Sequence, residues 1–85
     1  MSNPVLSVEL AREALKHGGV VYCNDTKENN RAVMLKEETT IWTPEEGDEP
    51  AFNFTLYQKP FNLTVRARDI GRFTYRENVH YSGPR

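Results

Sequence analysis

The chain has 85 residues, of which 38% are hydrophobic and 27% charged, and its formal net charge is −1. A chain of this length forms one domain, and its apolar content suffices for a hydrophobic core, which excludes a disordered protein. The single cysteine, Cys23, excludes an internal disulfide. No secretion signal and no apolar run of about 20 residues is recognisable, so we expect a cytoplasmic protein that does not cross a membrane.

The first predicted element is a helix over residues 7–17, SVELAREALKH, in which apolar residues recur at helical spacing. Ser7 suits the N-cap, because its hydroxyl can accept a hydrogen bond from a first-turn N–H, and Gly18 suits the left-handed position that ends a helix. Phosphate-binding loops lead from a strand through glycines into a helix N-terminus. Gly18 and Gly19 lead out of a helix instead, which excludes such a loop here.

The rest of the chain alternates apolar and polar residues with the period of β-strands. Strands are predicted at residues 20–24, 31–37, 39–43, 51–56, 61–68 and 72–76. Pro44 ends the third of them, and the acidic segment EEGDEP (45–50) is predicted to be a solvated loop. The predicted fold is therefore α+β, with one N-terminal helix packed on an antiparallel β-meander of about five to six short strands. We expect the domain to span residues 1–77 and residues 78–85 to form a loose tail.

Two turns predict how the later strands pair. The link at residues 57–60 places Phe54 opposite Leu63. The segment Asp69-Ile70-Gly71 matches a three-residue hairpin loop, in which Gly71 would take the left-handed conformation. That hairpin would place Arg68 directly opposite Arg72.

The predicted C-terminal hairpin gathers four arginines, Arg66, Arg68, Arg72 and Arg76, on its outward face. Like charges directly opposite on a sheet cost up to ~1 kcal/mol, so this arginine face is explained if it meets an anion. The anion is a phosphate, a nucleic acid, or acidic side chains of a partner or of the EEGDEP segment itself. The alternative is a solvated face that deters edge-to-edge aggregation.

Catalytic and metal sites are not indicated by the remaining candidates. Cys23 lies among apolar residues and reads as a small buried hydrophobic residue, because a reactive thiol needs a nearby cation or helix N-terminus. One cysteine and two histidines do not supply the four ligands of a structural zinc site. We find no set of nucleophile, base and orienting residue, so we expect neither an enzyme nor a cofactor or metal.

We expect Trp42 to be a core or core-edge residue. The alternative is that it anchors a partner, since Trp and Tyr dominate binding hot spots. The uncharged stretch Ala51 to Gln58 would be a hazard at an exposed sheet edge, so this strand is either central or covered. A homodimer would supply that cover, and we expect the protein to form one.

The predicted function is a small, non-catalytic binding or regulatory protein, of the inhibitor or adaptor kind, that contacts a protein partner through an exposed sheet face or edge. The candidate binding residues are Arg66, Arg68, Arg72, Arg76, Tyr57 and Trp42. The alternative is nucleic-acid or nucleotide binding through the arginine face. It is disfavoured because Asn and Thr, rather than aromatic residues, occupy the outward positions beside the arginines. An enzyme that uses Cys23 ranks third.

Overall fold

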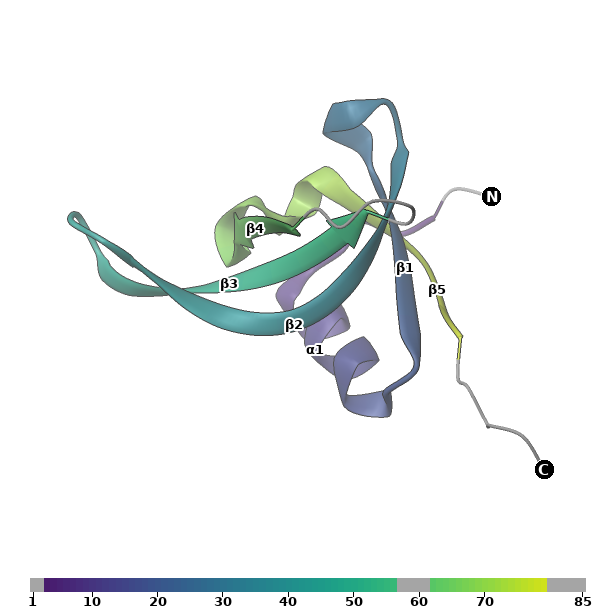
Figure 1. The fold of residues 1–85 in the computed structure, drawn as a ribbon, viewed down its shortest axis with the longest axis horizontal. Helices are drawn as coiled ribbons and strands as arrows, with labels where there is room; N and C mark the ends of the chain where they lie inside the picture. Colours follow the sequence, from purple (N-terminus) through teal and green to yellow (C-terminus); the bar gives the residue numbers. More distant parts are fainter. Residues whose placement is uncertain (1–2, 57–61, 80–85) are drawn as a thin grey trace.

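The computed structural model describes residues 3–56 and 62–79, which form one helix packed on an antiparallel sheet (Figure 1). The strand order in the sheet is β4-β3-β2-β1-β5, and every neighbouring pair is antiparallel. The predicted α+β class, with an N-terminal helix on a sheet of five strands, is thus confirmed. The elements in chain order are α1 (Val8–His17), β1 (Val20–Asp25), the 3₁₀ helix η1 (Thr26–Glu28), β2 (Arg31–Thr43), β3 (Gly47–Leu56), β4 (Asn62–Arg66), the 3₁₀ helix η2 (Ala67–Arg72) and β5 (Phe73–Val79).

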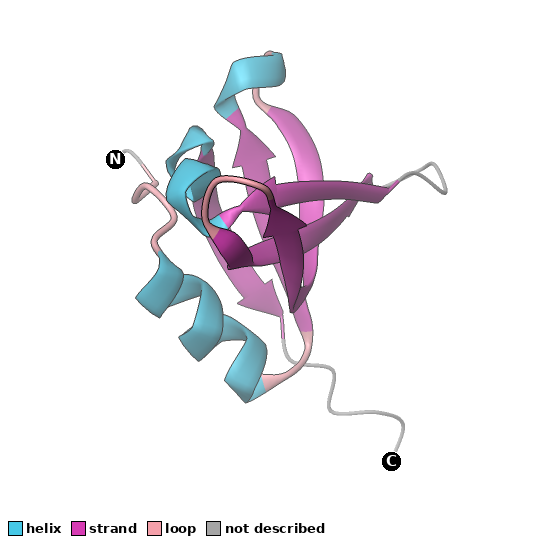
Figure 2. Cartoon of the chain, turned by 90° about the vertical axis from the view of Figure 1, so that its left-hand side faces the viewer, coloured by secondary structure: helices cyan, strands magenta, loops and turns pink. Residues whose placement is uncertain are grey.

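Helix α1 begins and ends where its capping residues predict. The Ser7 hydroxyl accepts a hydrogen bond from the Leu10 N–H at 3.1 Å. Gly18, with φ 76°, follows the last turn, and its N–H donates to the Leu15 carbonyl at 3.1 Å. The helix lies along one side of the sheet (Figure 2) and buries Ala11 and Ala14 there.

The first four strands form a meander, with two departures from the predicted boundaries. Residues 31–37 and 39–43 belong to one long strand, β2. A bulge between Leu35 and Glu37 shifts the alternation of apolar and polar residues, and the pairing with β3 continues on both sides of it. The acidic segment is not wholly a loop, since β3 begins at Gly47 and residues 44–46 alone form the turn. The predicted pairing of Phe54 with Leu63 is confirmed.

The predicted hairpin between β4 and β5 is wrong. Residues 67–72 form η2, and β5 crosses over to pair with β1 at the other end of the sheet order. Ile70 explains the difference, because its side chain is only 4% exposed and enters the core, where a hairpin loop would leave it in solvent. Gly71 is consequently not in a left-handed conformation, and Arg68 and Arg72 are not strand partners.

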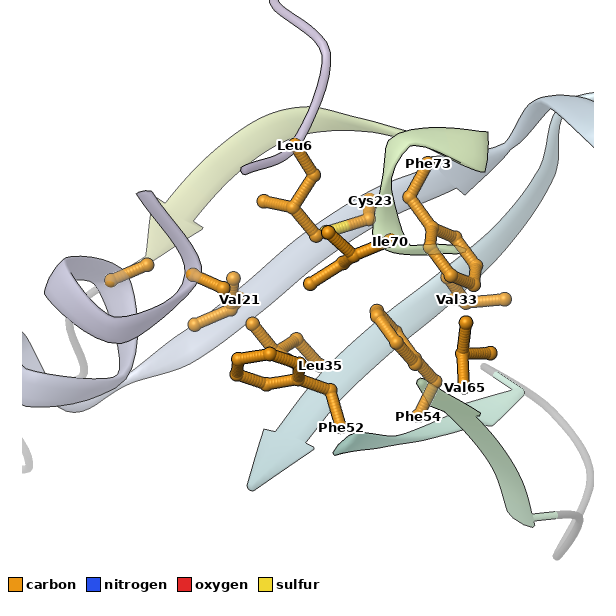
Figure 3. Packing of buried hydrophobic residues seen from close by; sticks show 12 residues of the cluster. Leu6, Val21, Cys23, Val33, Leu35, Phe52, Phe54, Val65, Ile70 and Phe73 are labelled. Carbon is orange, nitrogen blue, oxygen red and sulfur yellow. The ribbon is translucent and has the colours of Figure 1, made fainter. Parts of the chain in front are cut away.

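The core lies between α1, η2 and the concave face of the sheet (Figure 3). Phe54 of β3 and Phe73 of β5 stack with their ring centroids 4.0 Å apart, although two strands separate them in the sheet order. The sheet must therefore be strongly curved. The largest fully buried apolar side chains of the core are Phe52, Phe54, Phe73, Leu6, Val21 and Val33.

Neighbouring strands cover the segments that prompted the expectation of a dimer. Residues 51–56 lie in β3, which pairs with β2 on one side and β4 on the other, so this stretch needs no second subunit to cover it. Tyr57 and Gln58, the end of the uncharged stretch, lie outside the described residues. Strand β5 extends to Val79, two residues beyond the predicted end of the domain. Pro4 and Leu6 hydrogen-bond with Tyr75 and Phe73 along its outer edge, each at 2.9 Å.

Candidate functional site

The four candidate arginines do not form one face. Arg72 binds Asp25, at the end of β1, through two parallel hydrogen bonds: Nε to Oδ1 at 3.0 Å and Nη2 to Oδ2 at 2.6 Å. The Asp25 side chain has no exposed surface, and the Arg72 side chain is 23% exposed. Arg72 therefore holds the crossover from η2 to β5 against the end of β1, a structural role that the predicted hairpin did not provide.

The buried carboxylate of Asp25 was not predicted from the sequence as part of a site. Burial alone would raise the pKa of this carboxyl group. The hydrogen bonds and charge of Arg72, the backbone N–H of Lys27 and the charge of Arg31 outweigh burial, so the pKa lies below its ordinary value. The sequence did carry a signal, because Val21, Cys23 and Asp25 alternate on the inward face of the strand. A charged residue at such a position requires a buried partner.

Arg68 contacts the acidic segment of its own chain. Its Nη1 lies 3.1 Å from Glu46 Oε2, and its Nε lies 3.6 Å from Glu49 Oε1. This was one of the four anions expected for the arginine face, and it accounts for Arg68 without an external ligand.

Arg76 lies elsewhere, as the extra residue at the bulge where β5 pairs with β1. Its guanidinium is 5.8 Å from the centroid of the Tyr22 ring, and its Nη2 is 3.7 Å from Glu77 Oε1. Such an exposed pair contributes little to stability.

Arg66 is the remaining candidate, at the end of β4. Among the described residues it has no hydrogen bond or ion pair, and it lines a surface depression together with Lys27 and Arg72. Arg66 and Arg72 are thus the only two of the four predicted arginines that share a surface feature in this part of the chain.

Trp42 is not a core or core-edge residue, because its side chain is 70% exposed. It lies on the β2–β3 hairpin, whose end extends past the rest of the sheet (Figure 1). We call residues 40–50 of this hairpin the hairpin arm. Trp42 pairs with Asp48 and Thr40 with Pro50, so these four residues share one face of the arm, and all four are exposed.

The hairpin arm is held by its turn and by η2. The Thr43 hydroxyl accepts a hydrogen bond from the Glu46 N–H at 3.2 Å and donates to the Gly47 carbonyl at 3.3 Å. Gly47, with φ 70°, takes the left-handed conformation that closes the turn. Arg68 then links the arm to η2 through Glu46 and Glu49.

The remaining candidates from the sequence are the thiol of Cys23, metal ligands, a membrane-spanning segment and Tyr57. Cys23 is fully buried, as predicted, and burial raises the pKa of its thiol to about 12. In residues 3–56 and 62–79 no group of three or more His, Cys, Asp or Glu side chains is placed to hold a metal ion. None of the helices described is long and apolar enough to cross a membrane. Tyr57 lies outside the described residues.

Comparison with protein-family models, with curated proteins and with solved structures gives no match to this chain.

Proposed function

We propose that this protein is a non-catalytic binding module that docks onto a protein partner through the hairpin arm. The observation that carries the proposal is the exposure of Trp42, at 70% of its side chain, on an arm that extends past the sheet. A tryptophan in this position has lost the burial that ordinarily stabilises such a large apolar side chain. Binding to a partner would restore that burial, and Trp is the residue most enriched among interface hot spots.

The surroundings of Trp42 favour a partner with a basic surface around an apolar pocket. Pro50 is its diagonal neighbour across the two strands and extends the apolar contact area on the same face. The arm also carries three exposed carboxylates, at Glu45, Glu46 and Asp48, and Arg68 offsets only part of this charge through Glu46. An apolar centre surrounded by charged residues has the anatomy of a protein-binding patch, and complementary charge would increase the association rate.

The arm is also suited to binding because hydrogen bonds within the chain shape its turn before a partner arrives. The hydrogen bonds of Thr43 shape the turn, and the ion pairs of Arg68 connect the arm to η2. Fixing a loop in advance lowers the entropy lost on association.

Trp42 is the only tryptophan in the chain, so its fluorescence reports directly on the proposed contact. We expect acrylamide to quench it strongly in the isolated protein. A partner captured from the native lysate with nuclease present should shift the emission to shorter wavelength and reduce the quenching. Trp42→Ala should lower the affinity for that purified partner by about 2 kcal/mol or more, the magnitude typical of a hot-spot residue.

A matched control is Val79→Ala, which removes another exposed apolar side chain, at the end of β5 and away from the arm. This variant should bind the partner as the wild type does, and both variants should unfold at the wild-type temperature. A partner that binds Trp42→Ala and the wild type equally well would contradict the proposal. The same holds if Trp42 is shielded from acrylamide in the isolated protein.

The alternative, nucleic-acid or nucleotide binding through one arginine face, is less favoured, because the four arginines do not all share a surface. Arg72 is paired with Asp25, Arg68 with Glu46 and Glu49, and Arg76 with Glu77.

A further inference from the structure

A second feature of the molecule is independent of the hairpin arm. We propose that the depression between η1, β4 and η2 binds the phosphate group of a small ligand. The depression has a volume of about 390 Å³, within the range of sites for small molecules. Its cationic lining residues are Lys27, Arg66 and Arg72, each from a different segment of the chain.

The three cations are not equivalent, and Arg72 is the one held in place. Its two hydrogen bonds to the buried Asp25 carboxylate use two of the five N–H donors of the guanidinium. The stacking of this guanidinium over the Phe73 ring, at 5.1 Å, further restricts its orientation. Arg72 therefore presents its remaining donors from a fixed group, which lowers the entropic cost of binding an anion.

Arg66 and Lys27 supply charge that no ion pair or hydrogen bond within the described structure engages. Neither side chain has a hydrogen bond or an ion pair with another described residue. By contrast, Arg12, Arg68, Arg72 and Arg76 each have a carboxylate partner. Two unpaired cations beside one oriented guanidinium is an arrangement in which an anion gains interactions that the protein does not make by itself.

A phosphate group fits this lining better than a carboxylate. Arg72 already binds one carboxylate, Asp25, and a second carboxylate would have two oxygens for cations from three segments. A terminal phosphate has three acceptor oxygens and a charge approaching −2, so each cation can take its own oxygen. Asp69 also lines the depression and reduces its positive charge, which leaves two unpaired cations, beside the Asp25-bound Arg72, against one carboxylate.

The rest of the lining suggests that the phosphate is attached to an organic group. Ile41 and Val65 form an apolar part of the wall, and the volume exceeds what a phosphate ion alone would occupy. A mononucleotide combines a phosphate with an apolar ring face and is the probe that tests this combination.

The experiment is a titration of ¹⁵N-labelled protein, followed by NMR at constant ionic strength, with inorganic phosphate, AMP and adenosine in separate arms. We expect phosphate and AMP to shift the amide signals of Lys27, Arg66 and Arg72 in a saturable way, and adenosine to shift none of them. Lys27→Gln and Arg66→Gln should each weaken binding about tenfold, the effect of one lost charge-assisted hydrogen bond. Lys36→Gln, which removes a positive charge outside the depression, should leave it unchanged.

Each outcome bears on the proposal. Equal affinity for phosphate and AMP supports a site for the phosphate group alone, and tighter binding of AMP supports a nucleotide. A further arm with an oligothymidylate tests a nucleic-acid backbone as the source of the phosphate. Tighter binding of the oligothymidylate than of AMP, with an affinity that falls as salt rises, would overturn the small-ligand proposal. The proposal is overturned if no arm gives saturable shifts, if adenosine binds as well as AMP, or if Lys36→Gln weakens binding as much as Arg66→Gln does. Arg72 is not substituted, because its loss would leave the buried Asp25 carboxylate without its two hydrogen bonds and with only Arg31, at 3.6 Å, as a partner.

Discussion

The buried pair of Asp25 and Arg72 predicts a large loss of stability in the variant Asp25→Asn. Asparagine has almost the same shape as aspartate, so the substitution leaves no cavity. It replaces a carboxylate oxygen with an amide N–H₂ that faces the donors of Arg72, and the arginine charge then has no buried partner.

The expected magnitude follows from the burial of the two side chains. Breaking a fully buried ion pair by removing one partner costs about 3 to 5 kcal/mol. Asp25 is fully buried, but Arg72 keeps 23% of its side chain exposed and can recover some hydration, so we expect the lower end, about 3 kcal/mol. A domain of this length has a free energy of unfolding of about 4 to 13 kcal/mol, so the variant should still fold at neutral pH but with much less stability.

The pH dependence of stability provides a second test of the same ion pair. The pKa of Asp25 lies below its ordinary value, so its stabilising contribution is fully present above the pKa of the unfolded chain, about 3.9. That contribution is lost as the pH falls through the pKa of the folded protein. The wild type should therefore lose its advantage over Asp25→Asn progressively below about pH 5. The paired carboxyl of Glu38 has a lowered pKa in both proteins, so its effect cancels in the difference.

The measurement is urea denaturation followed by far-ultraviolet circular dichroism, because Trp42 is exposed in the folded protein and its fluorescence would change little on unfolding. Glu77→Gln is the matched control, since it removes a carboxylate whose pair with Arg76, at 3.7 Å, is largely exposed. This control should cost less than about 1 kcal/mol. Equal effects of the two variants, or a wild-type advantage that does not change with acid, would refute the reasoning.

Two further predictions concern conformation and burial. Gly47→Ala should destabilise the protein by about 1 kcal/mol, because φ is 70° at this position. Gly71→Ala should be neutral or slightly stabilising, because the added Cβ meets only Val5 Cγ1, at an ordinary 3.7 Å. Urea titrations of both variants measure the two effects, and a larger loss of stability at Gly71 than at Gly47 would contradict this prediction. Cys23 should react with a thiol reagent at neutral pH only after denaturant is added, because it is fully buried with a pKa of about 12, and rapid modification of the native protein would disprove its burial.

Local signals predicted the helix and the meander well, because each depends on residues close in sequence. The capping positions of Ser7 and Gly18 define α1, and alternation alone locates β1 and β3 to within a few residues. The register of Phe54 with Leu63 also follows from a short link. The bulge at Lys36 could not be predicted this way, because it changes which residues face inward without a break in the strand.

The C-terminal half shows where such signals fail. The segment ARDIGR, residues 67–72, is compatible both with a hairpin loop and with a 3₁₀ helix, and its turn chemistry favours the hairpin. The choice depends on distant contacts: Ile70 enters the core, Phe73 stacks on Phe54, and Arg72 finds Asp25 at the end of β1. The partner of Arg72 is 47 residues away in sequence, so no local pattern identifies it.

Helix η2 explains why the arginines could not be treated as one group. From this short helix, Arg68 contacts the hairpin arm, whereas Arg72 contacts Asp25 and lines the depression that Arg66 also borders. In the predicted hairpin, Arg66, Arg68 and Arg72 would lie on one face of a two-stranded sheet, and their mutual repulsion would require an external anion. The 3₁₀ helix separates them and gives two of them carboxylates of the chain itself. Of the four candidate arginines, Arg66 alone has no hydrogen bond or ion pair with another described residue. It lines the depression together with Lys27, so the arginine charge available to a ligand lies there rather than on a sheet face.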